Sequence, residues 1–327
     1  MKANGLAAAA VMILCACGGS GDTIIDGGND GAANDGTTND AGSQDGSTND
    51  VATDDAPSEA SNFDPASVLG LVLWLEADVS SSITFYPTDG GVQNIATWAD
   101  QTSHHNDAKG LPESVARNPS VKNSAINTLP AVHFDQIGVN ATTGQMLTII
   151  DNADASLQWG TGDFFVAVVG DFDNDPANGQ NEGVGLFYSK AAFTGVNTPP
   201  VGLYLYGNVP AVNVNPSVGM IFATSNTAND FVTTSTAYNN ATAHLFAIRR
   251  RGATLDLLVD GVSVATSNSN TVDVTASKMN VRIGADGDAS LFRLDGDIGE
   301  MLAVKGTLSS ADEAGLDSYL KAKWGTP

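Results

Sequence analysis

The amino-acid sequence predicts an all-β sandwich that ends in one α-helix and is preceded by a disordered acidic linker. Three observations carry this prediction. From residue 65 onward the chain is a long series of short apolar runs separated by Gly, Asn, Asp and Pro, which is typical of β-sandwiches and barrels. A helical spacing of apolar residues becomes clear only after residue 308. Residues 17–64 are rich in Asp, Asn, Gly and Thr and poor in apolar side chains.

Residues 1–16 look like an export signal. Lys2 is followed by a small-apolar run that ends at Leu14, and this run is too short to span about 30 Å of hydrocarbon as a helix. The tetrad Leu14-Cys15-Ala16-Cys17 resembles the bacterial lipobox, which implies cleavage before Cys17 and attachment of lipid to its thiol. The alternative is an ordinary secretory signal. Because Gly18 rather than Asp follows the cysteine, the resemblance favours the outer membrane or the cell surface.

Residues 17–64 are expected to form a flexible tether. From Gly18 to Asp64 the segment contains acids at intervals of about five residues but no Lys or Arg. Such a composition buries too little apolar surface to offset the loss of backbone entropy, so it favours disorder. A random coil of this length spans about 35 to 40 Å. A calcium-responsive acidic repeat is the alternative, although the regular nonapeptide of calcium-binding solenoids is missing.

Residues 65–327 are predicted to form one jelly-roll domain. The strands are expected at 69–77, 92–99, 131–135, 146–150, 164–172, 184–189, 201–206, 218–224, 244–250, 254–259, 262–266, 281–283 and 298–304. Asp260-Gly261 separates two of these runs and suits a two-residue type I′ hairpin turn, because both positions need positive φ. Ser310-Ala311-Asp312-Glu313 reads as a capping box that opens a helix, with Gly325 at its end.

Several blocks resemble the bacterial laminin-G-like group of concanavalin-A-like jelly-roll domains. They are Leu71-Val72-Leu73-Trp74-Leu75-Glu76-Ala77, Thr97-Trp98-Ala99-Asp100-Gln101-Thr102, Leu129-Pro130-Ala131-Val132-His133-Phe134-Asp135, Gly296-Asp297-Ile298-Gly299-Glu300 and Tyr319-Leu320-Lys321-Ala322-Lys323-Trp324-Gly325. The resemblance, with the blocks in this order, covers nearly all of residues 65–327. The resemblance implies the fold, but domains of this fold bind glycans, bind proteins or hydrolyse glycans, so it does not choose a function.

No catalytic motif is recognised, and we therefore expect no enzyme. The glucanases of this fold carry Glu-x-Asp-x-x-Glu on one strand, whereas Glu76-Ala77-Asp78 is followed by Ser81 at the sixth position. Glu76 is expected to end a strand at the surface. Asp295, Asp297 and Glu300 are expected in a solvated turn and the strand that follows it. A divergent glycan hydrolase or lyase remains the alternative.

Calcium is the one cofactor that the sequence suggests. Asp171, Asp173 and Asp175 place hard oxygens at alternate positions, and Glu182 follows at the spacing of an EF-hand-like loop. Pro176 replaces the turn glycine of such loops, so an ordinary acidic loop is the alternative. The resemblance implies a calcium at the sandwich rim, for which Asp100, Asp135 and Asp297 are further candidates. The adjacent His104 and His105 are expected in a loop without zinc.

Aromatic side chains decide whether a sugar could stack on this domain. Trp74, Trp98 and Trp324 lie inside the fold-defining blocks and are expected in the core, whereas Trp159, Tyr204 and Tyr206 are the candidates for ligand binding. The three consecutive arginines at 249–251 end a predicted strand before Gly252 and are expected at the solvent boundary, with an anion-binding patch as the alternative.

The formal net charge of −23 excludes a nucleic-acid binder that works through counterion release. Much of this charge belongs to the linker and says little about partners. The sequence therefore predicts a non-catalytic cell-envelope binding module, lipid-anchored at Cys17, for a glycan or a surface protein. A purely structural envelope role is a further alternative.

Overall fold

The structure is a computed structural model. It describes residues 63–87, 91–135, 144–150, 154–172, 184–192, 201–208, 232, 234, 236, 238, 240, 242–267, 273–274, 280–285 and 294–327. The strands are β1 (Leu71–Glu76), β2 (Ile83–Phe85), β3 (Ile95–Trp98), β4 (Ala108–Lys109), β5 (Ser120–Ile126), β6 (Leu129–Phe134), β7 (Leu147–Ile149), β8 (Phe164–Gly170), β9 (Val184–Ala192), β10 (Val201–Asn208), β11 (His244–Arg251), β12 (Thr254–Val259), β13 (Val262–Ser267), β14 (Val281–Ile283) and β15 (Gly296–Lys305). Three short 3₁₀ turns (Pro65–Ser67, Ser80–Ser82 and Val115–Arg117) and the helix α1 (Ser310–Trp324) complete the described elements.

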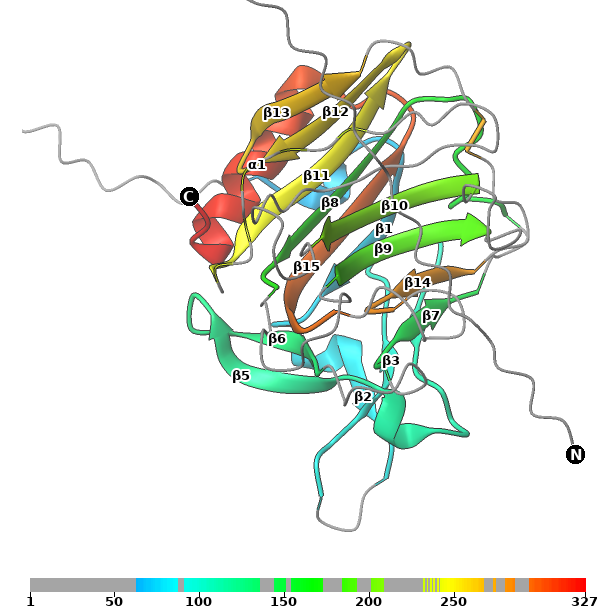
Figure 1. The fold of residues 1–327 in the computed structure, drawn as a ribbon, viewed down its shortest axis with the longest axis vertical. Coiled ribbons are helices and arrows are strands. Elements are labelled where there is room, and N and C mark those ends of the chain that lie inside the picture. The colour runs from blue at the N-terminus through cyan, green and yellow to red at the C-terminus, as the bar shows by residue number, and fades with distance from the viewer. Residues whose placement is uncertain are drawn as a thin grey trace, which may run out of the picture. The chain divides into compact units, whose positions relative to one another are not determined.

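The strands form two antiparallel sheets, which confirms the all-β sandwich (Figure 1). The eight-stranded sheet has the order β13-β12-β11-β8-β15-β6-β5, and β1 also pairs with β15. The seven-stranded sheet has the order β10-β9-β14-β7-β4-β3-β2. Strands distant in sequence are neighbours, since β8 lies between β11 and β15. Within the described part of the chain, no helix is long and apolar enough to cross a bilayer.

Both faces of the eight-stranded sheet are buried along its central strands, such as β8 and β15. Along β15, Met301 and Ala303 face the core between the sheets, whereas Leu302 and Val304 face the outer side, where α1 packs. This alternation follows the two-residue period of a strand. The outer side of the sheet and α1 therefore form a second core. The strands beneath α1 carry apolar side chains, or charged side chains that form ion pairs, on both of their faces.

The predicted hairpin is confirmed. β12 and β13 are joined at Asp260 and Gly261, whose φ angles are 50° and 77°. Leu255 and Leu257 face the core between the sheets, as expected, while Leu258 faces α1. The turn is held in place from both sides, because the Asp260 carboxylate accepts hydrogen bonds from the backbone of β11 and Lys321 of α1 donates to the Asp260 carbonyl.

The helix starts one residue away from the predicted cap. Ser309, rather than Ser310, is the N-cap, and its hydroxyl accepts a hydrogen bond from the Asp312 backbone N–H. The helix buries Leu316, Leu320 and Trp324 against the sheet and ends at Gly325 in the left-handed conformation. The predicted cap was wrong by one position because two adjacent serines offer the same capping oxygen.

Most expected strands are present with boundaries shifted by a few residues, and the strand expected at 218–224 lies outside the described residues. Three strands escaped the prediction. β2 and β4 are too short to show a period, and β5 places exposed polar side chains in its middle. At the N-terminal side, Phe63 and Asp64 belong to the folded unit rather than to the linker, because Asp64 caps the turn Pro65–Ser67 and Phe63 packs with the helix core.

Candidate functional site

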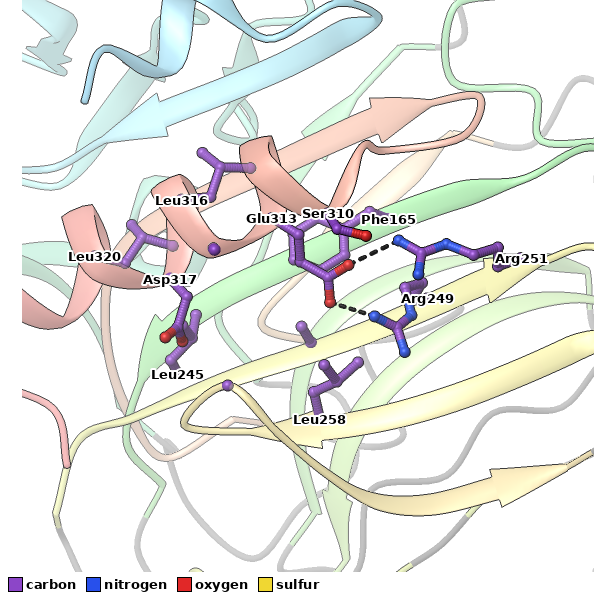
Figure 2. Close-up of a pocket in the computed structure, with 13 residues that line it drawn as sticks. Phe165, Leu245, Arg249, Arg251, Leu258, Ser310, Glu313, Leu316, Asp317 and Leu320 are labelled. Carbon is purple, nitrogen blue, oxygen red and sulfur yellow. Dashed lines mark hydrogen bonds and ion pairs between the residues drawn. The ribbon is translucent and has the colours of Figure 1, made fainter.

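A groove of about 350 Å³ runs between α1 and the outer face of the eight-stranded sheet (Figure 2). Its floor is apolar, with Phe165 from β8, Leu245 from β11 and Leu258 from β12. Leu316 and Leu320 of α1 form the opposite wall. The floor and wall residues are each at most 5% exposed, and the polar side chains stand toward the two ends, so a ligand would meet mainly the polar side chains at the rim.

One end of the groove carries two arginines and one glutamate. Arg249 forms ion pairs with Glu313 and with Asp256, the latter at 2.6 Å. Arg251 lies 2.9 Å from Glu313 and also donates to the Leu308 carbonyl at 3.0 Å. Glu313 therefore joins α1 to β11 through both guanidinium groups, as Figure 2 shows.

The arginines at 249–251 do not form an anion-binding patch. Alternate residues of a strand point to opposite faces, so Arg249 and Arg251 point to the groove and Arg250 points into the sandwich. Arg250 is 1% exposed and donates hydrogen bonds of 2.7 Å to the Gly160 and Gly162 carbonyls. Arg250 therefore departs from the expectation that this run marks the solvent boundary, whereas Arg251 remains 38% exposed.

The other end of the groove carries the carboxylate of Asp317. This carboxylate lies over Gly261, where an added Cβ would stand 2.7 Å from the Asp317 carboxyl carbon. Its Oδ1 atom is buried and has no hydrogen-bond partner in the described part of the chain. Burial, with the nearby charges of Asp260 and Glu313, raises the pKa of Asp317, while Lys321 opposes this shift. The groove thus contains one acid whose hydrogen-bonding capacity is not used by the fold.

A cluster of buried charges lies under the C-terminal part of α1. The carboxylate of Glu300 is fully buried and accepts hydrogen bonds from the indole of Trp74 at 2.7 Å and the indole of Trp324 at 2.8 Å. Lys323 lies 3.0 Å from Glu300 and 2.9 Å from Asp78, and it also pairs with Glu76. Burial acts to lower the pKa of Lys323, but the three carboxylates outweigh it and raise that pKa. Burial is also the main reason that the pKa of Glu300 is raised.

This cluster corrects the expectation for Glu76 and adds to the one for Glu300. Glu76 does end a strand, but its side chain is turned toward Lys323 and is 12% exposed, so it does not lie at the surface. Glu300 lies on a strand, as expected, but it is fully buried, because Trp324 packs directly over β15. The close packing of Trp324 on β15 requires glycine at position 299, because an added Cβ there would lie 2.6 Å from the Trp324 ring. These acids therefore stabilise the seam between β1, β15 and α1.

A second cluster lies where β5, β6, β8 and β15 meet. Asp297 is 3% exposed and pairs with Lys122 at 2.9 Å and His133 at 2.7 Å, so it is not in a solvated turn either. Burial would raise the pKa of Asp297, but the hydrogen bonds from His133 and Lys122 lower it. The Asp171 carboxylate accepts a hydrogen bond from the Asp297 backbone at 2.9 Å. Burial and the neighbouring Asp297 raise the pKa of Asp171 to about 6.

The architecture matches solved structures over most of the chain. It is similar to the binding domain of Paraclostridial Mosquitocidal Protein 1, with a TM-score of 0.51 and 10% identity over 79% of this chain and 55% of that structure. The fold is concanavalin-A-like. This confirms the predicted fold class, with the single helix at the C-terminal end.

Two further concanavalin-A-like neighbours differ in what they do. The binding domain of Botulinum neurotoxin DC in complex with rat synaptotagmin II has a TM-score of 0.49 at 10% identity, with 79% of this chain and 55% of that chain covered. An arabinofuranosidase complexed with arabinofuranosyl-α-1,2-xylobiose has a TM-score of 0.48 at 12% identity, with 78% of this chain and 59% of that chain covered. The chain spans less than two thirds of each of these structures. At these identities the likeness concerns the fold alone.

No protein-family model and no curated protein sequence matches the chain.

The rim of this concanavalin-A-like sandwich tests the calcium prediction only in part. Of the four expected ligands, Asp171 is described, whereas Asp173, Asp175 and Glu182 lie outside the described residues. Among the residues that are described, no group of three or more His, Cys, Asp or Glu side chains could hold a metal. His104 instead lies 2.8 Å from Asp154.

Asp100, another calcium candidate, already has all its oxygens engaged. Its Oδ1 accepts hydrogen bonds from the backbone of Trp74 and Thr102, and its Oδ2 accepts from the Thr102 hydroxyl and the Asn106 backbone. Asp100 therefore fixes a loop of the sandwich. Asp297 is likewise occupied by a lysine and a histidine, which supply the positive charge that a cation would bring.

The aromatic candidates for sugar stacking are placed differently from what we expected. Trp159 and Tyr204 are each 2% exposed, so neither presents a ring face to solvent. The Trp159 indole donates to the Tyr188 hydroxyl inside the core. Tyr206 lies on β10, and its side chain is outside the described residues. The expected core positions of Trp98 and Trp324 are confirmed, while Trp74 is only partly buried.

The groove residues were missed as a group. The arginines on β11 and the acids on α1 were each visible in the sequence, but nothing in it shows that the last helix returns to β11. One signal was available: Arg249 and Arg251 are two apart on a strand, and Glu313 and Asp317 are four apart on a helix, so each pair shares one face.

Asp171→Asn should stabilise the folded unit above about pH 6. A raised carboxyl pKa means that the folded state binds the proton more tightly than the unfolded state, so the stability associated with Asp171 falls as pH rises from about 4 through 6. Removing the charge should increase the free energy of unfolding by up to about 3 kcal/mol near pH 8, and the gain should vanish near pH 4. Urea unfolding at both pH values measures this. The exposed Asp135→Asn is the control, and an equal gain in both variants would contradict the explanation.

Proposed function

We propose that this protein is a non-catalytic binding module of the cell envelope that holds a glycan or a surface protein in the groove between α1 and the eight-stranded sheet. The groove carries the proposal, because hydrogen-bonding groups of both charges stand at its rim beside an apolar floor that the helix largely covers. Sugars and protein side chains both present apolar faces next to hydroxyl or amide groups. The volume of about 350 Å³ suits a group of about one sugar ring or one large side chain.

The absence of catalysis is also proposed from the positions of the acids. Glu300 is covered by Trp324, and Glu76 and Asp78 are turned toward Lys323. Asp297 is held by Lys122 and His133. Acids that serve as partners for internal cations are not placed to protonate a glycosidic oxygen or to attack a sugar carbon.

The N-terminal segment completes the proposal. The lipobox-like tetrad before Cys17 supports a lipid anchor in the outer membrane or at the cell surface, and the acidic segment that follows supports a spacer between anchor and module. Acyl chains contribute about 0.8 kcal/mol per buried CH₂, so two or three chains anchor a protein stably. Palmitate labelling of the full chain should be lost in Cys17→Ser, and labelling that persists would refute the anchor.

The binding proposal is tested on the chain from residue 18 to 327, which keeps the whole folded unit and lacks the proposed lipid site. Glycan arrays and pull-downs from envelope preparations, with and without calcium, should reveal a ligand. Arg251, 38% exposed at the rim of the groove, should contribute a hydrogen bond, so Arg251→Ala should weaken binding about tenfold.

The control for Arg251→Ala is Lys109→Ala, which removes the same charge at an exposed site on β4. If both variants bound the ligand equally well, the ligand would have to bind outside the groove. If no ligand were detected in any of these assays, the proposed binding function would be contradicted. Turnover on a panel of polysaccharides would favour the hydrolase or lyase alternative instead.

A further inference from the structure

A row of polar side chains crosses the outer face of the seven-stranded sheet. Each member of the row is paired in register with the next, so all of them lie on one face of the sheet. They are Tyr204 of β10, Ser189 of β9, Arg282 of β14, Thr148 of β7, Lys109 of β4, Thr97 of β3 and Thr84 of β2. Their neighbours along the strands, such as Val281, Ile149 and Ala108, belong to the core between the sheets. The row therefore faces away from that core.

Solvent reaches only one part of the row. Tyr204 and Ser189 are 2% and 1% exposed, so the β10 end is covered. From β14 to β2 the side chains of the row are partly or fully exposed, with Lys109 and Thr84 the most open. Neighbouring strands lie about 4.8 Å apart, so this accessible part is about 19 Å long. Such a length suits an extended ligand that crosses the strands.

The accessible part of the row carries positive charge and no acid. Lys109 and Arg282 lie on the two strands that flank Thr148. No carboxylate among the described residues pairs with Lys109. The nearest acid along β4, Asp107, already accepts a hydrogen bond from the Asp100 backbone at 3.1 Å. In a chain with a formal net charge of −23, this row is a local exception that attracts an anion.

An apolar side chain lies beside the cations. Ile150 follows directly after β7, two residues from Thr148, and is 59% exposed. The hydroxyl groups of Thr148 and Thr97 can each donate and accept a hydrogen bond. A sugar offers the matching groups, because its ring has an apolar face and its edge carries hydroxyls.

From these observations we infer that the outer face of the seven-stranded sheet is a second binding site, and that it takes a negatively charged glycan. The inference goes beyond the proposed function, because the groove lies on the other sheet. A carboxylate or sulfate group of the glycan binds over Thr148, where Lys109 and Arg282 can both reach it. One sugar ring packs on Ile150, and the following rings cross β3 and β2 toward Thr84.

The test compares two probes that differ only in charge: an oligomer of galacturonic acid, and the same oligomer with methyl-esterified carboxyl groups. Isothermal titration with the chain 18–327 should show at least about tenfold tighter binding of the acid form. This preference should shrink as the salt concentration rises. A galactose oligomer with and without sulfate groups tests the other anion in the same way. A preference for charge in neither pair would overturn the inference.

Two variants locate the site. Lys109→Gln should remove most of the preference for charge, and Thr148→Val should weaken binding of the acid form several-fold, while melting temperatures show that both are folded. Lys305→Gln removes the same charge at an exposed site at the end of β15 and should retain the preference. Equal losses in Lys109→Gln and Lys305→Gln would show a general effect of net charge and would overturn the inference.

The remaining outcomes separate this inference from the proposed function. Lys109→Ala remains the control for the groove, because β4 belongs to the other sheet. If Arg251→Ala weakens binding of the acid form and Lys109→Gln does not, the anionic glycan binds in the groove; the inference then fails and the proposed function stands. If the acid form binds through Lys109 and no groove variant changes the binding of any ligand, the inference stands and the proposed function fails. Equally tight binding of a poly-aspartate peptide of the same charge would overturn the assignment to a glycan.

Discussion

Replacing Lys323 by methionine should lower the free energy of unfolding by about 3 to 5 kcal/mol at neutral pH. Lys323 faces Glu76, Asp78 and Glu300, and it is 15% exposed. Methionine retains the length of the side chain but leaves these carboxylates without their cation in a largely buried site. Chemical denaturation monitored by circular dichroism measures the loss.

Two comparisons make this prediction specific. Lys321→Met removes a lysine from the same helix, where the ammonium donates one hydrogen bond of 3.2 Å to a carbonyl oxygen within the described residues, and should cost less than about 1 kcal/mol. The deficit of Lys323→Met should also shrink toward acid pH, because protonation removes the uncompensated charges and the pKa of Glu300 is already raised by burial. Equal losses in the two lysine variants would contradict the role of the cluster.

A third variant measures the coupling within the cluster. Glu300→Gln alone should be destabilising, since its amide group faces one of the two indole donors. In the double variant the loss caused by Lys323→Met should be smaller than in the wild-type background, because one uncompensated charge is gone. A strictly additive result would show that Lys323 and Glu300 act independently.

Arg250→Leu should have the second large effect, a loss of about 3 kcal/mol. The buried guanidinium donates to the Gly160 and Gly162 carbonyls and lies 4.9 Å from the centre of the Phe164 ring. Leucine fills part of the volume but removes the donor to the Gly162 carbonyl and one of two donors to the Gly160 carbonyl, which also accepts from the Val274 backbone N–H, and it removes the cation from the Phe164 ring. The same denaturation experiment measures the change.

The neighbouring arginine provides the control. Arg251→Leu removes the same chemical group one residue later, at a site where the side chain is 38% exposed, and should cost less than about 1 kcal/mol. Arg250→Lys should fall between the two, because an ammonium can reach one carbonyl but does not reproduce the fork geometry. If Arg251→Leu were the more damaging variant, the assignment of faces along β11 would be wrong.

The sequence predicted the fold well because its signals were local. The Asp260-Gly261 turn needs positive φ at both residues, and only a few residue types provide it. The short apolar runs from β6 to β15 reflect the two-residue period of strands and the turn residues between them. The final helix was visible from its cap and its apolar spacing, although two adjacent serines shifted the predicted start by one residue.

The site was predicted poorly because its residues come together only in three dimensions. Nothing near Glu300 in the sequence shows that Trp324 covers it, so its full burial was not predicted. Trp159 precedes a glycine, as an exposed ring in a loop would, but it packs on Phe164 and Tyr188. The arginines at 249–251 looked like a strand end facing water, whereas the partners described for them are 57 or more residues away, apart from Asp256. In each case the missing information was a long-range contact.

Phe63 has a mechanical consequence for the anchor that we propose at Cys17. Its ring fills the space over Gly315 of α1, just before the chain turns through Pro65–Ser67 into β1. Traction from the anchor would therefore first load the contact between Phe63 and α1, the helix that forms one wall of the groove, before it reached the β1–β15 ladder. Gly315→Ala would displace Phe63 and shift that load to the strands. The lifetime of the complex with the ligand under an applied force would then depend on Gly315, a residue that does not contact the ligand.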